Sequence, residues 1–219
     1  AAAAGLGIDT IVTDHHLAPE GPPHACAVVN PQLPGSRYPF LHLTGAGLAL
    51  KLAQALYHSI GWDDEHWQQP LLPLAALGTV GDVAPLVDEN RSIVRQGLRE
   101  LGRTSAPGLR ALLRSAHLEG RIPDTEAVGW ALAPRLNAAG RMGHAIVSYE
   151  LLVTESEERA TALAATLEQQ NRERQRLTAE AQDKARSLVE LQPLLIVSDP
   201  SFLPGVIGLV AGRLVEELG

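Results

Sequence analysis

An aspartate and two histidines, Asp14, His15 and His16, stand in a row directly after a short run of β-branched and apolar residues. Such a run predicts a β-strand, and parallel α/β sheets bind ligands at the carboxyl ends of their strands. Carboxylate oxygen and imidazole nitrogen suit Mn²⁺, Zn²⁺ or Fe²⁺, and a carboxylate beside a histidine can fix its tautomer. The triplet therefore indicates a metal site, although the polar residues of a surface turn would give the same pattern.

A second candidate is Asp82, which lies in the segment Gly78–Leu86 among small and apolar residues. These neighbours predict a buried or half-buried carboxylate, and burying a charge is costly unless the group is paired or binds a metal. Asp82 is therefore a candidate metal ligand. The alternative is an aspartate that ends a helix and caps a backbone turn.

The run Pro134–Met142 brackets an asparagine and several small residues with two arginines, Arg135 and Arg141. Small side chains let a phosphate approach the backbone, and Asn137 and Arg141 can donate hydrogen bonds to it. This run is our candidate for a nucleic-acid contact. A helix end with arginines facing solvent is the alternative.

Two further patterns each admit two interpretations. The glycines of Gly205–Arg213 could cradle a phosphate at a helix start, or let helices pack closely, which we favour for Gly212. Arginines spaced by four residues predict one charged helix face, either a ridge that tracks DNA or, more simply, a solvated surface. They are Arg91, Arg95, Arg99 and Arg103.

Strand and helix patterns alternate along most of the chain. We expect strands at 8–13 and 25–29 and helices at 44–60, 71–78, 91–101, 108–116 and 125–132. Strands that alternate with helices predict an α/β fold with a mostly parallel sheet. The strand at 8–13 is nearly continuously apolar, which predicts that it is buried.

A long helix is expected from 154 to 191, where no proline or glycine interrupts the chain and Thr154 and Glu157 have the spacing of a capping box. At about 50 Å it exceeds what one small domain needs, so we interpret it as a connector that Pro193 ends. A buried strand at 194–198 and a helix at 205–218 follow. The expected segments are thus a domain at 1–153, the connector at 154–191 and the beginning of a second domain at 192–219, with both outer domains cut.

The composition indicates a globular protein, with 45% apolar and 20% charged residues in a chain of 219. No apolar run approaches the roughly 20 residues that span a bilayer, and the single cysteine excludes an internal disulfide framework. These features predict a cytoplasmic protein without a membrane partner. The net charge of −7 disfavours a passive DNA-coating protein but allows an enzyme with a local basic groove.

Taken together and in this order, the segments resemble those of the DHH phosphoesterase superfamily. The run Val12–His16 is similar to the signature of that superfamily, and the segment Gly78–Leu86 resembles a later one. The run Arg135–Met142 is more specific and resembles the RecJ-type exonucleases. The segment Gly205–Arg213 looks like the start of the DHH-associated domain, known as DHHA1, which usually follows a connector helix.

The resemblance implies a nuclease that removes nucleotides from the 5′ end of single-stranded DNA, in recombination and repair, with two Mn²⁺ or Mg²⁺ ions. His15 and Asp82 would ligate metal, Asp14 would orient the histidines and His16 would contact the scissile phosphate. Phosphates of the DNA would be held by further donors: Arg135, Asn137 and Arg141. A helicase and a single-strand binding protein are the further partners that the resemblance implies.

The chain departs from the family pattern because the family's upstream aspartate ligands have no counterpart here. His15 and Asp82 alone under-ligand a hard cation, which prefers about six positions. We therefore expect little or no nuclease activity from the chain alone. Two alternatives stay open: another DHH phosphoesterase that acts on oligoribonucleotides or cyclic dinucleotides, and a catalytically inactive RecJ-like subunit that binds nucleic acid.

Overall fold

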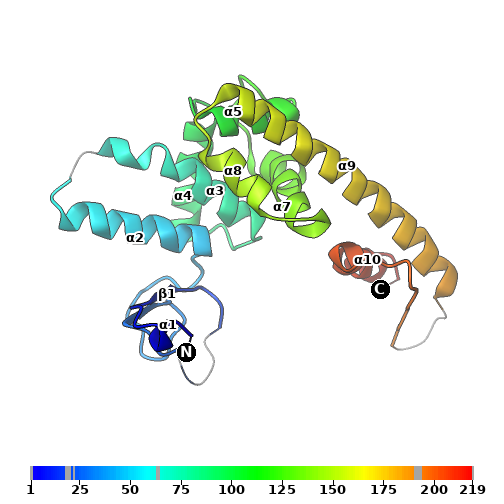
Figure 1. Ribbon diagram of the computed structural model, residues 1–219, viewed down its shortest axis with the longest axis horizontal. Coiled ribbons are helices and arrows are strands. Elements are labelled where there is room, and N and C mark those ends of the chain that lie inside the picture. Colours follow the sequence, from blue (N-terminus) through cyan, green and yellow to red (C-terminus); the bar gives the residue numbers. More distant parts are fainter. Residues whose placement is uncertain (1, 18–20, 22, 63–64, 190–193, 219) are drawn as a thin grey trace. The chain divides into compact units, whose positions relative to one another are not determined.

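The computed structural model describes residues 2–17, 21, 23–62, 65–189 and 194–218 (Figure 1). They form two compact units. The first contains Ala1–Thr104 and Leu118–Ala133, and the second contains Ser105–His117 and Pro134–Gly219. The sequence predicts domain boundaries at 153 and 191. The two compact units divide the chain at other positions, so those boundaries stay a prediction.

The first unit begins with a short parallel sheet. Helix α1 (Ala2–Gly5) precedes strand β1 (Ile11–Thr13), which pairs in parallel with β2 (Ala27–Val29), Val12 lying opposite Val28. The parallel pairing agrees with the predicted α/β class, within a mostly helical structure. The predicted burial of the first strand is wrong: Ile11 is 67% exposed, because a sheet of two short strands leaves much of its surface uncovered.

Helices make up the rest of the first unit. They are α2 (Gly45–Ser59), the short 3₁₀ turn η1 (Glu65–Gln68), α3 (Leu71–Gly81), α4 (Asp88–Leu101), α6 (Thr125–Ala127) and the π-helical turn η2 (Val128–Leu132). The helices predicted at 44–60, 71–78 and 91–101 are confirmed, although α4 begins earlier than expected. Phe40, Leu43, Leu48, Leu72 and Ile93 belong to the core beneath α2, α3 and α4.

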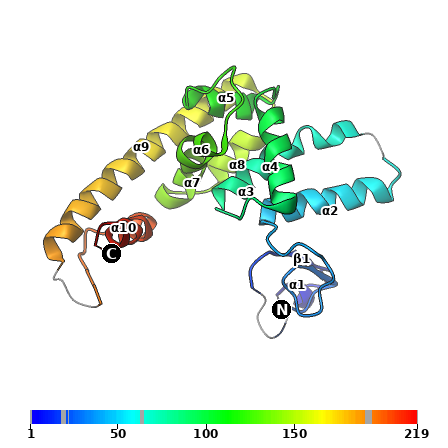
Figure 2. The ribbon, with the colours of Figure 1, turned by 180° about the vertical axis from the view of Figure 1, so that it is seen from behind.

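Helices α3 and α4 form an antiparallel hairpin joined by residues 82–87, and Figure 2 shows the two helices side by side. A methyl group on Gly97 of α4 would overlap the carbonyl oxygen of Leu72 and the side chain of Ala76 on α3. On the other side, Gly78 of α3 touches Ala46 of α2 in the same way. Because Gly97 and Gly78 have no side chain, α3 packs closely against both α4 and α2. This close packing sets the position of the C-terminal end of α3.

The second unit is built around one long helix. Its helices are α5 (Pro107–Ser115), α7 (Ala133–Met142, whose first residue falls in the first unit), α8 (Ile146–Val153), α9 (Glu157–Leu188) and α10 (Pro204–Leu218). The 32 residues of α9 span about 48 Å, close to the length that the sequence predicts, and the role of this helix as a connector between domains stays a prediction. The predicted cap is wrong. Ser156, not Thr154, accepts the Arg159 amide, because Thr154 ends α8 and its hydroxyl accepts the Ser156 amide.

The segment before α10 is not the strand that the sequence predicts. Residues 194–198 pair with no strand in the described ranges, and Leu194 and Ile196 are exposed. A run of apolar β-formers becomes a strand only when a neighbour completes the ladder. Pro193, the expected end of the connector, lies outside the described residues.

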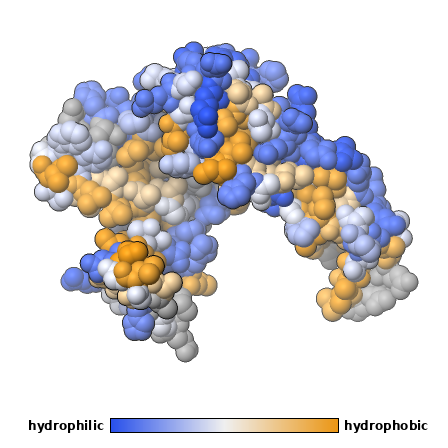
Figure 3. All heavy atoms as spheres, viewed as in Figure 1, coloured by the Kyte–Doolittle hydropathy of each residue, from blue (hydrophilic) through white to orange (hydrophobic). Residues whose placement is uncertain are grey.

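Figure 3 shows hydrophilic side chains along the outer edge of α9.

Helix α10 packs on the last turns of α9. Ala181 and Ala185 of α9 meet Val206 and Val210 of α10 in a small buried cluster. At its rim, Arg186 of α9 pairs with Glu217 of α10. Among the described helices, none is long and apolar enough to cross a membrane.

Candidate active site

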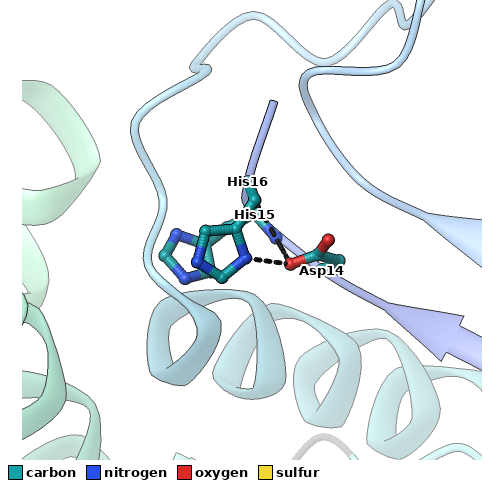
Figure 4. A group of neighbouring side chains, drawn as sticks. All are labelled: Asp14, His15 and His16. Carbon is teal, nitrogen blue, oxygen red and sulfur yellow. Dashed lines mark hydrogen bonds and ion pairs between the residues drawn. The ribbon is translucent and has the colours of Figure 1, made fainter. Parts of the chain in front are cut away.

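The Asp14 carboxylate organises the three-residue cluster at the end of β1. Its Oδ1 accepts the amide of His15 at 2.7 Å, the amide of His16 at 3.2 Å and Nδ1 of the His16 ring at 2.7 Å (Figure 4). These hydrogen bonds, the ring contact first, hold the pKa of Asp14 below its ordinary value. With Nδ1 donating to a carboxylate, the remaining His16 nitrogen, Nε2, is left to face a ligand.

Two polar residues after β2 fix the main chain of this cluster. Asn30 donates to the carbonyl of His16 at 2.9 Å, and Gln32 donates to the carbonyl of His15 at 2.6 Å. The Asn30 side chain also accepts the Gln32 amide, while the Asp14 amide continues the sheet by donating to Val29. Both strands therefore end at one point, and the second positions the histidines of the first.

Asp82 faces the cluster from the end of α3. Its Oδ2 lies 3.7 Å from Nδ1 of His15. The Asp82 side chain is 51% exposed and that of His15 24%, so the predicted burial of Asp82 is wrong. Asp82 is the C-cap of α3, where the chain leaves the packed hairpin. Directly after it, Val83 has a φ of 56° and is 89% exposed, an unusual conformation for a β-branched residue.

The first turn of α2 and the start of α4 support this arrangement. Gly45 of α2 lies against the His15 ring. The N-cap residue Thr44 accepts the Gly47 amide, and its hydroxyl meets that of Thr79 on α3 at 3.3 Å. Fully buried Asn90 of α4 donates to the carbonyl of Pro85, which anchors the loop that carries Asp82.

The pair of His15 and Asp82 fits a divalent cation, and beside it the ligand atoms of Asp14, His15 and His16 lie within 4.8 Å of one another. Two ligands of one ion, each at about 2.1 Å, are at most about 4.2 Å apart, and the 3.7 Å between His15 and Asp82 falls inside this limit. The mixed oxygen and imidazole donors suit Mn²⁺.

The phosphate-binding candidates lie in the second unit, and Arg135 is already engaged there. Its Nε is 2.7 Å from Glu168 Oε2, and the guanidinium also donates to the carbonyl of Ser115. The side chain is largely buried. These contacts favour a role in joining α7, α9 and α5, and the predicted contact with DNA stays a prediction.

Asn137 and Arg141 are exposed and lie four residues apart, on one face of α7. Arg141 also donates to the carbonyl of Gly205 at 3.4 Å, so α7 meets the start of α10 here. A side chain at Gly205 would overlap the Arg141 backbone, whereas Gly212 faces open space. Our preference for Gly212 as the packing glycine was wrong, because Gly205 makes the close contact.

Sequence reasoning missed two arginines that gather near Arg141. Arg174 of α9 has a lowered pKa because it is partly buried and because Arg141 and Arg213 of α10 lie near it. Neutral oxygens hold two of these guanidiniums: Asn171 accepts from Arg174, and Gln182 accepts from Arg213. These arginines come close to one another only because the helices pack together, so no local sequence pattern could have predicted the cluster. Asn30 was also missed, although the Asn-Pro pair that closes β2 marked the position.

Comparison with known proteins shows which sequences and structures this chain resembles. Residues 1–79 match the DHH family, N-terminal domain. The chain is 42% identical over 216 residues to the single-stranded-DNA-specific exonuclease RecJ of Bacillus subtilis, covering 97% of this chain and 27% of that protein. With RecJ of Dickeya dadantii the identity is 38%, over 96% of this chain and 40% of the relative.

Solved structures of RecJ exonucleases are also similar to this chain. RecJ from Thermus thermophilus in complex with Mn²⁺ has a TM-score of 0.86 and 35% identity, over 96% of this chain and 31% of that one. An exonuclease RecJ bound to manganese has a TM-score of 0.88 and 34% identity, over 99% and 54%. The predicted RecJ-type resemblance and fold class are confirmed. The chain spans well under two thirds of the length of these relatives.

Proposed function

We propose that this chain supplies part of the active site of a Mn²⁺- or Mg²⁺-dependent exonuclease, which hydrolyses phosphodiester bonds of single-stranded DNA from its 5′ end. The observation that carries the proposal is the approach of His15 to Asp82 beside the Asp14–His16 hydrogen bond. The relatives are named single-stranded-DNA-specific exonucleases, and two of the solved structures hold manganese. A helicase and a single-strand binding protein as partners rest on the family resemblance alone.

The residues divide the work as follows. His15 and Asp82 hold metal, which when bound supplies an activated water and stabilises the leaving oxygen. Asp14 remains an ionised acceptor because its pKa is lowered, and it keeps His16 oriented with Nε2 toward the scissile phosphate. Exposed Asn137 and Arg141 donate hydrogen bonds to DNA phosphates.

A chimera tests the proposal. This chain replaces the matching segment of the Bacillus subtilis relative, and Mn²⁺-dependent release of nucleotides is measured on 5′-phosphorylated single-stranded DNA, duplex DNA and dinucleotides. We expect the single strand to be preferred. His15→Ala should lower turnover more than about 100-fold, beyond the usual loss for a residue that only supports a metal ligand, whereas Asp14→Asn should cost about 10- to 100-fold.

The control is His24→Ala, an exposed histidine on the loop between the two strands, which should leave turnover unchanged. Preference for dinucleotides would favour another DHH phosphoesterase. A folded chimera that binds DNA without turnover would favour the inactive binding subunit. The chain alone should show little or no digestion, because His15 and Asp82 provide only part of a ligand set.

A further inference from the structure

The outer face of α4 carries a row of arginines that the proposed active site does not use. Arg91, Arg95 and Arg99 are exposed, while the intervening Ile93, Val94, Gly97 and Leu98 are buried. We call Arg91, Arg95 and Arg99 the arginine stripe. Arg103, the fourth member of the sequence repeat, is exposed just beyond the helix end.

The stripe has no acidic partner within the described ranges. Within the described structure no ion pair involves any of its three guanidiniums, whereas Arg110, Arg135 and Arg172 each pair with a glutamate. Glu89, an acid on the same helix, is occupied by the Tyr38 hydroxyl and by Lys51. The stripe therefore concentrates uncompensated positive charge on a chain whose net charge is −7.

The stripe borders an open groove of about 470 Å³. Ser92, Gln96 and Asp88 complete its lining, so the described lining includes one carboxylate and no apolar residue. A protein partner is normally anchored by buried aromatic or aliphatic side chains, for which this groove offers no pocket. A polyanion held through its charges fits the groove better.

The spacing and direction of the stripe favour a nucleic-acid backbone. Residues four apart on a helix are displaced by about 6 Å along its axis, similar to the repeat of phosphates along an extended single strand. Because α4 runs antiparallel to α3, with Gly97 beside Leu72, Arg91 lies at the end of the hairpin that carries Asp82. The row leads away from the candidate metal ligands.

We propose that the arginine stripe of α4 binds the phosphate backbone of the single strand at a distance from the cut. This inference rests on the proposed function for its substrate class. The stripe contacts phosphates without reading bases, so it raises affinity for long strands regardless of sequence. Short oligonucleotides that fill only the active site do not reach it.

The test compares Arg91→Gln/Arg95→Gln/Arg99→Gln with the unmodified chain, using fluorescence anisotropy with a short and a long oligothymidylate. We expect the triple variant to bind the long strand at least tenfold more weakly at low salt, with the short strand unaffected. The slope of log affinity against log salt should fall by about 2 for the long strand, since each phosphate contact on a single strand contributes about 0.7.

The matched control removes the same charge from arginines that are paired. Arg110, Arg159 and Arg176, which bind Glu157, Glu150 and Glu173, are changed to glutamine. This control should keep most of the salt slope. Arg91→Lys/Arg95→Lys/Arg99→Lys, which keeps the charge, should retain long-strand binding. Circular dichroism checks that every variant is folded.

If the triple variant and the unmodified chain bind the long strand equally well, the proposal that the arginine stripe binds DNA is wrong. If Arg141→Gln weakens binding while the triple variant does not, the stripe fails and the proposed function stands. If the unmodified chain binds neither oligonucleotide, both fail. A polyglutamate peptide that binds the chain, and loses affinity in the triple variant while DNA does not, would assign the stripe to an acidic protein instead.

Discussion

Helices α4 and α9 both carry arginines at similar spacings, but the charges of these arginines are compensated differently. On α9, Arg172 pairs with Glu168, and Arg176 lies between Glu173 and Glu180. On α4, Arg95 has no such acid in the described structure. The α9 pairs satisfy each charge within one or two turns, whereas α4 leaves its charges outward.

The difference shows that arginine spacing alone does not distinguish a stabilised helix from a binding surface. The presence or absence of neighbouring acidic residues distinguishes the two cases. Pairs at three or four residues contribute a few tenths of a kcal/mol each to a helix, which is useful to one as long as α9. An unpaired row gives the fold no such benefit, and α4 is held instead by its buried face against α3.

The largest effect is expected on that buried face. Gly97→Ala should destabilise the chain by about 3 kcal/mol, because the new methyl group would meet the Leu72 carbonyl and Ala76 on α3. Urea unfolding measures the change. Gly129→Ala, where the methyl group meets open space, is the control and should be neutral or slightly stabilising. The stripe substitutions should stay within about 0.5 kcal/mol, and a larger loss would mean that the arginines support the fold.

A smaller effect is expected on α9. Glu173→Gln/Glu180→Gln removes both acids that flank Arg176 and should destabilise the chain by about 0.5 kcal/mol in low salt. The melting temperature should fall slightly, and the difference should vanish at high salt, where exposed pairs are screened. A difference that persists at high salt would contradict the comparison, since it would indicate a role for these acids other than surface pairing.

The smallest effect concerns pH. Hydrogen bonding from Arg186 holds the pKa of Glu217 below its ordinary value of 4.5. A lowered pKa stabilises the folded chain above that ordinary value, and the contribution is lost as the pH falls through the lowered one. The melting temperature of the unmodified chain should therefore exceed that of Glu217→Gln near neutrality and converge with it in acid. A gap that widens in acid would show that the sign is wrong.

Local patterns revealed much of this molecule. The helices followed from apolar periodicity. Asp14, His15 and His16 were singled out by their place after a predicted strand, and Asp82 by its small and apolar neighbours. The structure brings all four together, and their catalytic roles stay proposals. Asp82 was found for a reason that fails, since its neighbours suggested burial and it is exposed.

The features that sequence could not provide depend on contacts between distant segments. Arg174 and Arg213 approach Arg141 only because α9 and α10 pack as they do. The strand expected at 194–198 lacks a neighbour in the described chain, and a strand is a property of a pair. Ser156 displaced Thr154 as a cap because two helices end and begin within a few residues.

The left-handed backbone at Val83 sets the stability of the fold against the proposed binding of a cation. A valine held there costs about 1–3 kcal/mol, which glycine would recover. Selection for heat resistance alone should therefore favour Val83→Gly. The same change would loosen the turn after Asp82, so variants chosen for thermal survival would lose the geometry that the proposed cation site requires. A directed-evolution experiment on this chain would need both criteria to keep the valine.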